Sequence, residues 1–295
     1  MTDVQTVSIP HLGQSRMGYR FGRAYDPALP TLVMVNSFST SSDLYRPQFA
    51  DEELSATANL LAIEPFGHGH TRTAYEHFTY WDSALGNLQV LDALGISSAF
   101  VLGTSQGGWV AARMAMLEPK RIQGIIPLGT SMDNESHRTR DLGCWDGREA
   151  CSPVIDSLSQ PLGDDWVPED AFSDFIVSVG IGDDIPQEEK DRVRAAHKAH
   201  YRGDDGRKRL RMCAINLRDR DGLHGRLDGV HCPVLWMHGT KDQVYSVANA
   251  EEEIRLFTSA ADASLSVVDG GQHFLSASDP QAVNRATVAF IKKWQ

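Results

Sequence analysis

A serine placed between two glycines is the strongest chemical feature of this sequence. In the segment VLGTSQGGWVAARMA, Gly103 stands two residues before Ser105 and Gly107 stands two residues after it. A serine hydroxyl is a poor nucleophile at neutral pH unless a neighbouring base accepts its proton. Glycines at these two positions remove the Cβ atoms that would collide if the serine lay on a sharp, strained turn. The pattern therefore predicts a nucleophilic serine on a tight turn, with its base supplied from elsewhere in the chain.

The residues on either side of Ser105 predict a strand before it and a helix after it. Residues 99–102 form a short apolar stretch, partly β-branched, as expected of a buried parallel strand. Over residues 109–117 apolar side chains recur at helical spacing. A G-x-S-x-G turn between a strand and a helix resembles the nucleophile elbow of the α/β-hydrolase fold superfamily. The resemblance implies an enzyme in which the serine attacks a carbonyl carbon.

Two further motifs resemble the same superfamily, and each directly follows a predicted strand. The strand over 233–238 runs into an H-G-x-x-D motif that ends at Asp242. The strand over 263–268 is followed by the loop GGQHF, which contains His273. The superfamily order is serine, then acid, then histidine, at the carboxyl edge of the sheet. The resemblance thus implies a triad in which His273 takes the proton of Ser105 and Asp242 orients the imidazole.

Other residues of suitable type leave alternatives open. Asp133 follows the strand predicted over 122–128, a place where some members of the superfamily carry their acid. His238 lies at a strand end and is interpreted as structural. His68 and His70 lie in a loop near the expected site and are weaker candidates for the base. Two histidines two residues apart are also a weak metal pattern, so we expect no metal and no organic cofactor.

Acyl transfer also needs hydrogen-bond donors for the oxyanion that forms on the substrate. The backbone N–H of Gln106 is one expected donor, since it begins the helix and benefits from the positive end of the helix dipole. In the superfamily the second donor lies in the loop after the strand that reads TLVMV here, and this loop usually begins with His-Gly. This chain has Asn36 and Ser37 there instead, and we carry the role over to the N–H of Phe38. The hydroxyls of Ser37 and Ser39 either assist or belong to ordinary turn residues.

The loop EPFGHGHT, from Glu64 to Thr71, is a further motif that resembles the superfamily. It resembles the acidic-x-x-Gly-x-Gly-x-Ser/Thr loop that follows the fourth strand in the superfamily, with a glutamate in place of the more usual aspartate. Its glycines are expected to serve turn geometry and not catalysis.

Strands and helices alternate along most of the chain. Alternation of this kind predicts a parallel sheet with helices on both faces and right-handed crossovers. The resemblance implies a mostly parallel, eight-stranded α/β-hydrolase sheet. The expected elements are a hairpin around 17–24, strands over 31–35, 60–64, 99–102, 122–128, 233–238 and 263–268, and helices over 81–96, 109–117 and 281–294.

Residues 134–229 interrupt this alternation and are crowded with charge. They resemble the helical cap that the superfamily inserts after its sixth strand, which implies a core of residues 1–133 and 230–295 and a cap of 134–229. The charged stretches are expected to be solvated helix faces. A set of apolar cap residues either faces the pocket or only holds the cap helices together: Phe172, Phe175, Ile176, Val177, Val179 and Ile181.

The composition of the chain limits the classes of binding partner and the cellular compartment that we expect. The 295 residues are 41% hydrophobic and carry a formal net charge of −11, which disfavours nucleic acid or an anionic membrane as a partner. We see no basic segment followed by an apolar leader and no long apolar span, so we expect a cytoplasmic protein that binds a small molecule. The four cysteines form no C-x-x-C pattern and are expected to be thiols, although a Cys144–Cys151 bridge stays open in an oxidising compartment. The oligomeric state is undetermined.

These features predict hydrolysis of a carboxylic ester, lactone or thioester of a small to medium apolar molecule through an acyl-enzyme on Ser105. Two alternatives stay open: hydrolysis of a carbon–carbon bond in a β-diketone-type substrate with the same triad, and a non-hydrolytic ligand-binding protein that has kept the fold. A serine nucleophile excludes the haloalkane dehalogenase and epoxide hydrolase routes, which in this superfamily require an aspartate at that position.

Overall fold

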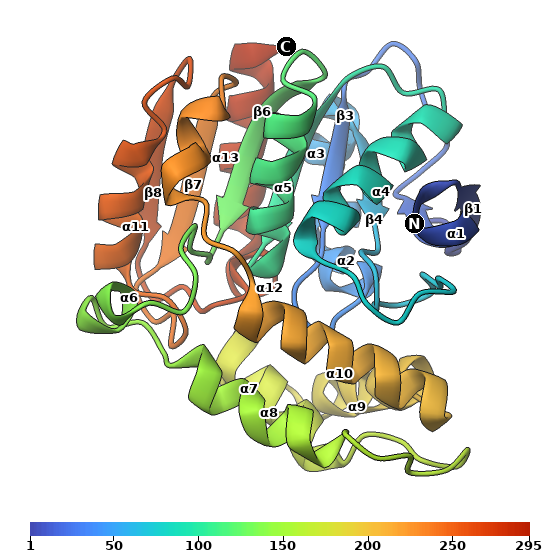
Figure 1. Ribbon diagram of the computed structural model, residues 1–295. Helices are drawn as coiled ribbons and strands as arrows, with labels where there is room; N and C mark the ends of the chain where they lie inside the picture. The colour runs from blue at the N-terminus through green and yellow to red at the C-terminus, as the bar shows by residue number, and fades with distance from the viewer.

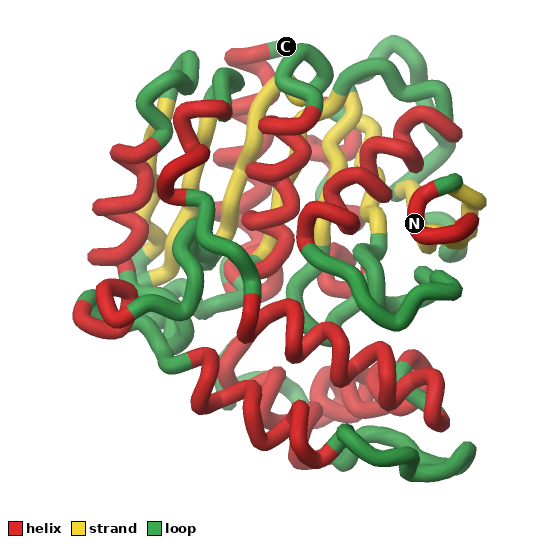
Figure 2. Tube along the Cα trace, viewed as in Figure 1, coloured by secondary structure: helices red, strands yellow, loops and turns green.

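The computed structural model describes residues 1–295 and has at its centre an eight-stranded sheet (Figures 1 and 2). The strand order is β1-β2-β4-β3-β5-β6-β7-β8. Only the β1–β2 and β2–β4 pairs are antiparallel, so the predicted mostly parallel eight-stranded sheet is confirmed. The strands are β1 (Gln5–Ile9), β2 (Ser15–Phe21), β3 (Thr31–Val35), β4 (Asn59–Ile63), β5 (Ala99–Thr104), β6 (Ile122–Leu128), β7 (Val234–Gly239) and β8 (Ala263–Val268).

Helices cover both faces of this sheet, and α4 and α5 lie on the opposite face from α3 and α13 (Figure 1). In β3, Val33 and Val35 belong to the apolar core on the α4 and α5 side, whereas Leu32 and Met34 belong to the core beneath α13. A strand buried on both faces is apolar throughout, because alternate side chains point to opposite faces. The helices flanking the sheet are α1 (His11–Gln14), α2 (Arg46–Phe49), α3 (Glu52–Thr57), α4 (Tyr80–Ala93), α5 (Gln106–Leu117), α11 (Val247–Glu253), α12 (Leu275–Ser278) and α13 (Pro280–Trp294).

Several element boundaries differ by a few residues from the sequence prediction; α4, for example, ends at Ala93 and not at residue 96. Helix α5 begins at Gln106, the residue expected to begin it and to supply an oxyanion donor. The apolar helical pattern starts only at Trp109, because Gly107 and Gly108 in the first turn have no side chain to contribute to it. The N-terminal hairpin is also longer than predicted, since β2 pairs with β1 over residues 5–9.

Residues 134–229, here named the cap segment, form helices beyond the carboxyl ends of the central strands (Figure 1). Helix α7 packs against α10, α8 packs against α9, and α8 also contacts α12 of the core. The division of the chain into a core and a cap at these boundaries stays a prediction. The helices of the segment are α6 (His137–Asp141), α7 (Gly147–Ser157), α8 (Asp170–Ile181), α9 (Gln187–His200) and α10 (Gly203–Asp219).

All four cysteines are buried and free, so the bridge between Cys144 and Cys151 that the sequence left open does not form. No helix combines the length and the apolar character needed to span a bilayer.

Candidate active site

Ser105 lies at the corner between β5 and α5 in a backbone conformation that side chains rarely adopt, with φ of 53° and ψ of −116°. Such a conformation costs roughly 1–3 kcal/mol and persists only where the surrounding structure imposes it. Here the N–H of Ser105 donates to the carbonyl of Leu128 at 2.8 Å. A Cβ on Gly103 would overlap the backbone of Gly107, and one on Gly107 would overlap the carbonyl of Val35. Both glycines are therefore required by close packing around the serine.

Three residues far apart in the sequence meet at this corner. The hydroxyl of Ser105 lies 3.0 Å from Nε2 of His273, and Nδ1 of His273 lies 2.9 Å from Oδ2 of Asp242. Ser105 and His273 are each 4% exposed, and the Asp242 side chain is fully buried. The chain of hydrogen bonds has the order that general-base activation of a serine requires. The structure thus brings together the three residues that the sequence motifs selected, while their catalytic role stays a proposal.

The loop after β7 fixes the Asp242 carboxylate from several directions. Its Oδ1 accepts the backbone N–H groups of Val244 and Tyr245 at 2.8 and 2.9 Å. Burial alone would raise the pKa of Asp242, but hydrogen bonds and charge from His273 and His238 outweigh burial and hold the pKa well below its ordinary range. The carboxylate is therefore charged at neutral pH, as an orienting group must be.

His238 contacts the triad acid, and sequence reasoning did not predict this contact. Its Nε2 lies 3.3 Å from Oδ2 of Asp242 and 2.8 Å from the carbonyl of Tyr245, and the side chain is fully buried. Burial lowers the pKa of His238, but the adjacent Asp242 more than compensates, and the net shift is upward. His238 therefore supports the acid and its loop, in agreement with the structural interpretation. The H-G-x-x-D spacing carries a signal for this, because the histidine and the acid lie four residues apart.

Asp133, the alternative acid, does not contact His273. Its carboxylate accepts the hydroxyl of Ser136 at 2.6 Å and the N–H of Asn134 at 2.8 Å. The structure therefore places Asp242, and not Asp133, on the imidazole.

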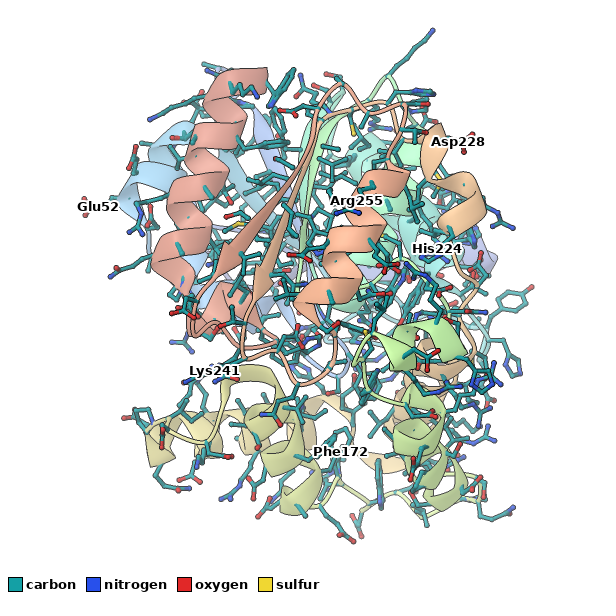
Figure 3. All side chains as sticks on the ribbon, turned by 90° about the vertical axis from the view of Figure 1, so that its left-hand side faces the viewer. Glu52, Phe172, His224, Asp228, Lys241 and Arg255 are labelled. Carbon is teal, nitrogen blue, oxygen red and sulfur yellow. The ribbon has the colours of Figure 1, made fainter.

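Asp133, His224 and Glu253 form a polar cluster in which one potential ligand atom of each lies within 4.8 Å of the others. Glu253 accepts a hydrogen bond from Nε2 of His224 at 2.7 Å on one oxygen and from the N–H of Met132 at 2.7 Å on the other. The bond to Glu253 raises the pKa of His224, which is labelled in Figure 3. The cluster is a hydrogen-bonded network near the two ends of the cap segment.

His68 and His70 also lie away from the Ser105 hydroxyl. Nδ1 of His68 donates to the carbonyl of Phe66 at 2.9 Å, and Nε2 lies 2.9 Å from the side-chain nitrogen of Gln106. Burial lowers the pKa of His68 to about 4, so the ring is neutral at pH 7 and Nε2 accepts the Gln106 N–H. His70 instead contacts Glu64 through its backbone N–H at 2.6 Å and Nδ1 at 3.2 Å.

The buried carboxylate of Glu64 accounts for the close packing at Gly69 in the loop that follows it. Burial would raise the pKa of this carboxylate, but hydrogen bonds from His70 and Ser42 lower it to about 2. Gly67 and Gly69 have φ of +82° and +47°, and a Cβ on Gly69 would overlap the Glu64 carboxyl group. The predicted turn role of these glycines is confirmed, and their close approach lets the backbone wrap a buried charge.

The two backbone groups expected to bind an oxyanion have no partner within the chain. Neither the N–H of Phe38 nor that of Gln106 donates a hydrogen bond to another residue. The Gln106 side chain joins their two segments, because its nitrogen donates to the carbonyl of Asn36 at 3.3 Å and also to His68. Sequence reasoning missed this link; the G-H-G pattern marked the loop but not the partner of its histidine.

Ser37 and Ser39, in the loop after β3, have different surroundings. Ser39 has φ of +56°, and its hydroxyl lies 3.5 Å from Nε2 of His197, so it is a turn residue facing the cap segment. Ser37 is 1% exposed, and its hydroxyl has no hydrogen-bond partner. It lines the same cavity as Ser105, so its hydroxyl remains available to a ligand.

The cavity beside Ser105 is small and apolar, with a volume of about 60 Å³. Phe172, Phe175, Ile176 and Val179 of helix α8 form much of its wall. Its other lining residues are Ser37, Phe38, Ser105, Trp145, Ala150, Cys151, Val154, Ala214, Leu217, Val244, Tyr245, His273 and Phe274.

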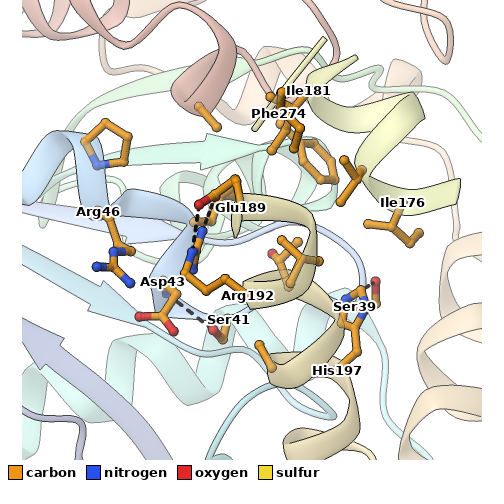
Figure 4. A pocket seen from close by; sticks show the side chains of 18 of the residues that line it. Ser39, Ser41, Asp43, Arg46, Ile176, Ile181, Glu189, Arg192, His197 and Phe274 are labelled. Carbon is orange, nitrogen blue, oxygen red and sulfur yellow. Dashed lines mark hydrogen bonds and ion pairs between the residues drawn. The ribbon is translucent and has the colours of Figure 1, made fainter. Parts of the chain in front are cut away.

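A larger groove of about 700 Å³ lies next to this cavity (Figure 4). Ile176 and Phe274 line both spaces, and Val177 and Ile181 line the groove. All six apolar cap residues singled out in the sequence therefore line one space or the other. Charged side chains also line the groove, and two of them, Arg192 and Glu189, form an ion pair.

Comparisons with known proteins agree with this architecture. Residues 30–143 match the model of the alpha/beta hydrolase fold family. The chain is 24% identical over 275 residues to the protein named carbamate hydrolase RutD from Variovorax paradoxus, covering 91% of this chain and 94% of that one. The structure resembles a thermophilic esterase from Thermogutta terrifontis with a TM-score of 0.77 at 17% identity, covering 98% of both chains. It also resembles an enol-lactonase from Burkholderia xenovorans with a TM-score of 0.75 at 21% identity, covering 97% of this chain and 100% of that one.

Proposed function

We propose that this chain, which belongs to the α/β-hydrolase fold superfamily, is a serine hydrolase that cleaves a carboxylic ester, lactone or thioester of a small to medium, mostly apolar molecule. The observation that carries the proposal is the hydrogen-bonded chain from Ser105 through His273 to Asp242, with distances of 3.0 and 2.9 Å. Because the fold alone does not dictate a reaction, the argument rests on this site.

In the proposed reaction the Ser105 hydroxyl oxygen attacks the substrate carbonyl while Nε2 of His273 accepts its proton. The resulting imidazolium is stabilised by the ionised Asp242. His273 then returns the proton to the leaving group as the bond to the acyl carbon breaks, which leaves an ester on Ser105. A water molecule gives its proton to His273 and attacks this ester, and the acid product leaves as Ser105 regains its hydrogen.

The oxyanion formed in both steps would be bound by the unpartnered N–H groups of Phe38 and Gln106. A preorganised donor of this kind contributes roughly 2.7–4 kcal/mol to catalysis. The buried Ser37 hydroxyl is a further available donor in the same cavity.

The cavity and the names of similar proteins support the proposed substrate class. Helix α8 gives the space at Ser105 an apolar wall, which favours an apolar acyl or leaving group. The similar proteins include an esterase, an enol-lactonase and a protein named as a carbamate hydrolase, and all three names describe hydrolysis at a carbonyl carbon.

A reactive fluorophosphonate and a panel of aryl esters, lactones and β-diketones test the proposal. The reagent should label Ser105 alone, and Ser105→Ala should lower kcat on the best ester by 10⁴-fold or more, since the nucleophile is removed. Ser39→Ala is the matched control, because this serine lies in the neighbouring loop and faces His197. Full activity of Ser105→Ala, or labelling of another residue, would contradict the proposal. Turnover of β-diketones alone would assign carbon–carbon bond hydrolysis to the same triad.

A further inference from the structure

Two residues that line the cavity beside Ser105 each carry a polar atom with no hydrogen-bond partner. These atoms are the indole nitrogen Nε1 of Trp145 and the hydroxyl oxygen of Tyr245, both buried. Both residues line the cavity that contains Ser105, whose remaining wall is almost wholly apolar. Buried polar groups in native proteins nearly always have a partner, so an unpartnered pair beside a nucleophile calls for a ligand.

Both side chains are anchored to the loop that holds the triad acid. The backbone N–H of Trp145 donates to the carbonyl of Val244 at 2.8 Å, and the N–H of Tyr245 donates to Oδ1 of Asp242 at 2.9 Å. The Tyr245 ring centre lies 5.7 Å from that of His273, and Tyr245 is only 2% exposed. The backbone of each residue is therefore fixed beside the loop of the triad acid, and the Tyr245 ring is buried next to His273.

The chemistry of the pair specifies what it can bind. Burial raises the pKa of Tyr245 far above its ordinary value, although the positive charge of Arg220 and, to a smaller extent, the Trp145 indole oppose the shift, so the hydroxyl keeps its proton. An indole N–H can only donate a hydrogen bond, and a protonated phenol donates well. The indole lies close enough to the hydroxyl to lower its pKa, but the geometry between the two groups falls short of a hydrogen bond. A ligand atom that meets both of them must be an acceptor.

We propose that Trp145 and Tyr245 bind a second oxygen of the substrate, distinct from the carbonyl that Ser105 attacks. The preferred substrate then carries a ketone, hydroxyl or carboxylate oxygen a few bonds from the scissile carbonyl. The small size of the cavity, about 60 Å³, limits this part of the substrate to a short group. The inference rests on the proposed function and narrows its substrate class.

Two isosteric pairs of p-nitrophenyl esters test the inference on the full chain. Acetoacetate is compared with isovalerate, and levulinate with isocaproate, because in each pair a ketone oxygen is replaced by a methyl group of similar size. The wild type should favour the keto ester in kcat/KM by about tenfold or more, since a site built for a hydrogen bond rejects the analogue that lacks it. A succinate half-ester distinguishes an anionic acceptor from a neutral one.

Trp145→Phe and Tyr245→Phe remove only the polar atoms, so each should lower this preference several-fold. The matched controls are Trp236→Phe and Tyr201→Phe, which remove equally buried and unpartnered polar atoms that lie outside the cavity and the groove. They should leave the preference unchanged. Because the preference is a ratio measured on one preparation, a partly misfolded variant does not distort it.

A wild-type ratio near one, or equal losses in the controls and the cavity variants, would overturn the inference. In that case hydrolysis of isovalerate and labelling of Ser105 would still support the proposed function. If no ester is hydrolysed and Ser105 is not labelled, the proposed function itself fails, and this inference fails with it.

Discussion

The catalytic corner and the cap segment hold their side chains in opposite ways. At the corner, Ser105, Asp242 and His273 are buried on loops that directly follow strands, and backbone N–H groups or ring nitrogens fix them. In the cap segment, helices α8 and α9 are joined on the outside by exposed or half-exposed ion pairs, such as Arg194–Asp174 at 2.8 Å and Lys198–Asp170 at 2.7 Å. Ion pairs of this kind contribute about 0–1 kcal/mol each. The contrast teaches that loops at the sheet edge fix the proposed catalytic residues, whereas the outer faces of α8 and α9 are joined by ion pairs that add little stability.

One of the close contacts between the two regions lies directly beside the triad. The N–H of Phe274 donates to the carbonyl of Gly180 at 2.6 Å, and a Cβ at position 180 would overlap the Phe274 ring. Phe274 directly follows His273 in the sequence, so this contact connects helix α8 to the neighbour of the triad histidine.

The largest expected effect distinguishes the two candidate acids. Asp242→Asn should lower kcat by about 10⁴-fold, because a neutral amide neither holds the correct imidazole tautomer nor stabilises the imidazolium. Asp133→Asn should keep most of the activity, since Asp133 contacts Ser136 and Asn134 and not His273. Steady-state kinetics on one aryl ester measures both variants. Equal losses of kcat in the two variants, or a larger loss in Asp133→Asn, would show that Asp242 is not the triad acid.

A second prediction breaks the contact between the regions. Gly180→Val should displace α8 from Phe274 and lower kcat/KM on the preferred ester on the order of 100-fold, because catalysis is sensitive to misplacement of about 1 Å. Labelling of Ser105 by a small fluorophosphonate should slow far less, since the corner itself is unchanged. Ser178→Ala is a neighbouring control on the same helix, since Ser178 lines neither the cavity nor the groove. A labelling rate that falls as much as the turnover would show that cap and chemistry are not separable.

A third prediction concerns the link between the two expected oxyanion donors. His68→Ala should lower kcat about tenfold with little change in KM, because the Gln106 side chain loses the acceptor that positions the first turn of α5. His68→Gln should recover much of the loss, since its amide oxygen can accept the same N–H. If His68→Ala raises KM alone, or if His68→Gln recovers no activity, His68 does not position the oxyanion donors and only fills space.

The smallest effect compares a buried histidine of each region under acid. Burial lowers the pKa of His68 in the core and of His197 in the cap segment from 6.5 to about 4. The unfolded chain then binds more protons than the folded one between these values, so the free energy of unfolding falls as the pH falls from 6.5 towards 4. Each histidine contributes at most on the order of 3 kcal/mol to this loss. Denaturant titrations of His197→Asn should show a weaker pH dependence than the wild type, whereas an unchanged slope would count against the burial effect.

Much of the fold and the site could be predicted from local sequence. The alternation of apolar strands with helical stretches gave the sheet, and the motifs around Ser105, Asp242 and His273 gave the three residues in their order. These signals are local, because a strand that runs into a loop and a glycine that permits a tight turn are properties of a few neighbouring residues. The apolar pattern alone does not mark the first turn of α5, because its glycines carry no side chain; the resemblance placed the helix start at Gln106.

Local sequence determined which residue types stand at the ends of which strands, and the tertiary structure alone decided which of them meet. Ser105 and His273 are 168 positions apart, and the choice of Asp242 over Asp133 depends on which loop lies beside the imidazole. The bond between His68 and Gln106 and the unpartnered pair of Trp145 and Tyr245 likewise exist only after distant segments pack together. Such contacts depend on how strands and helices pack in space, so the spacing of residues along the chain does not predict them.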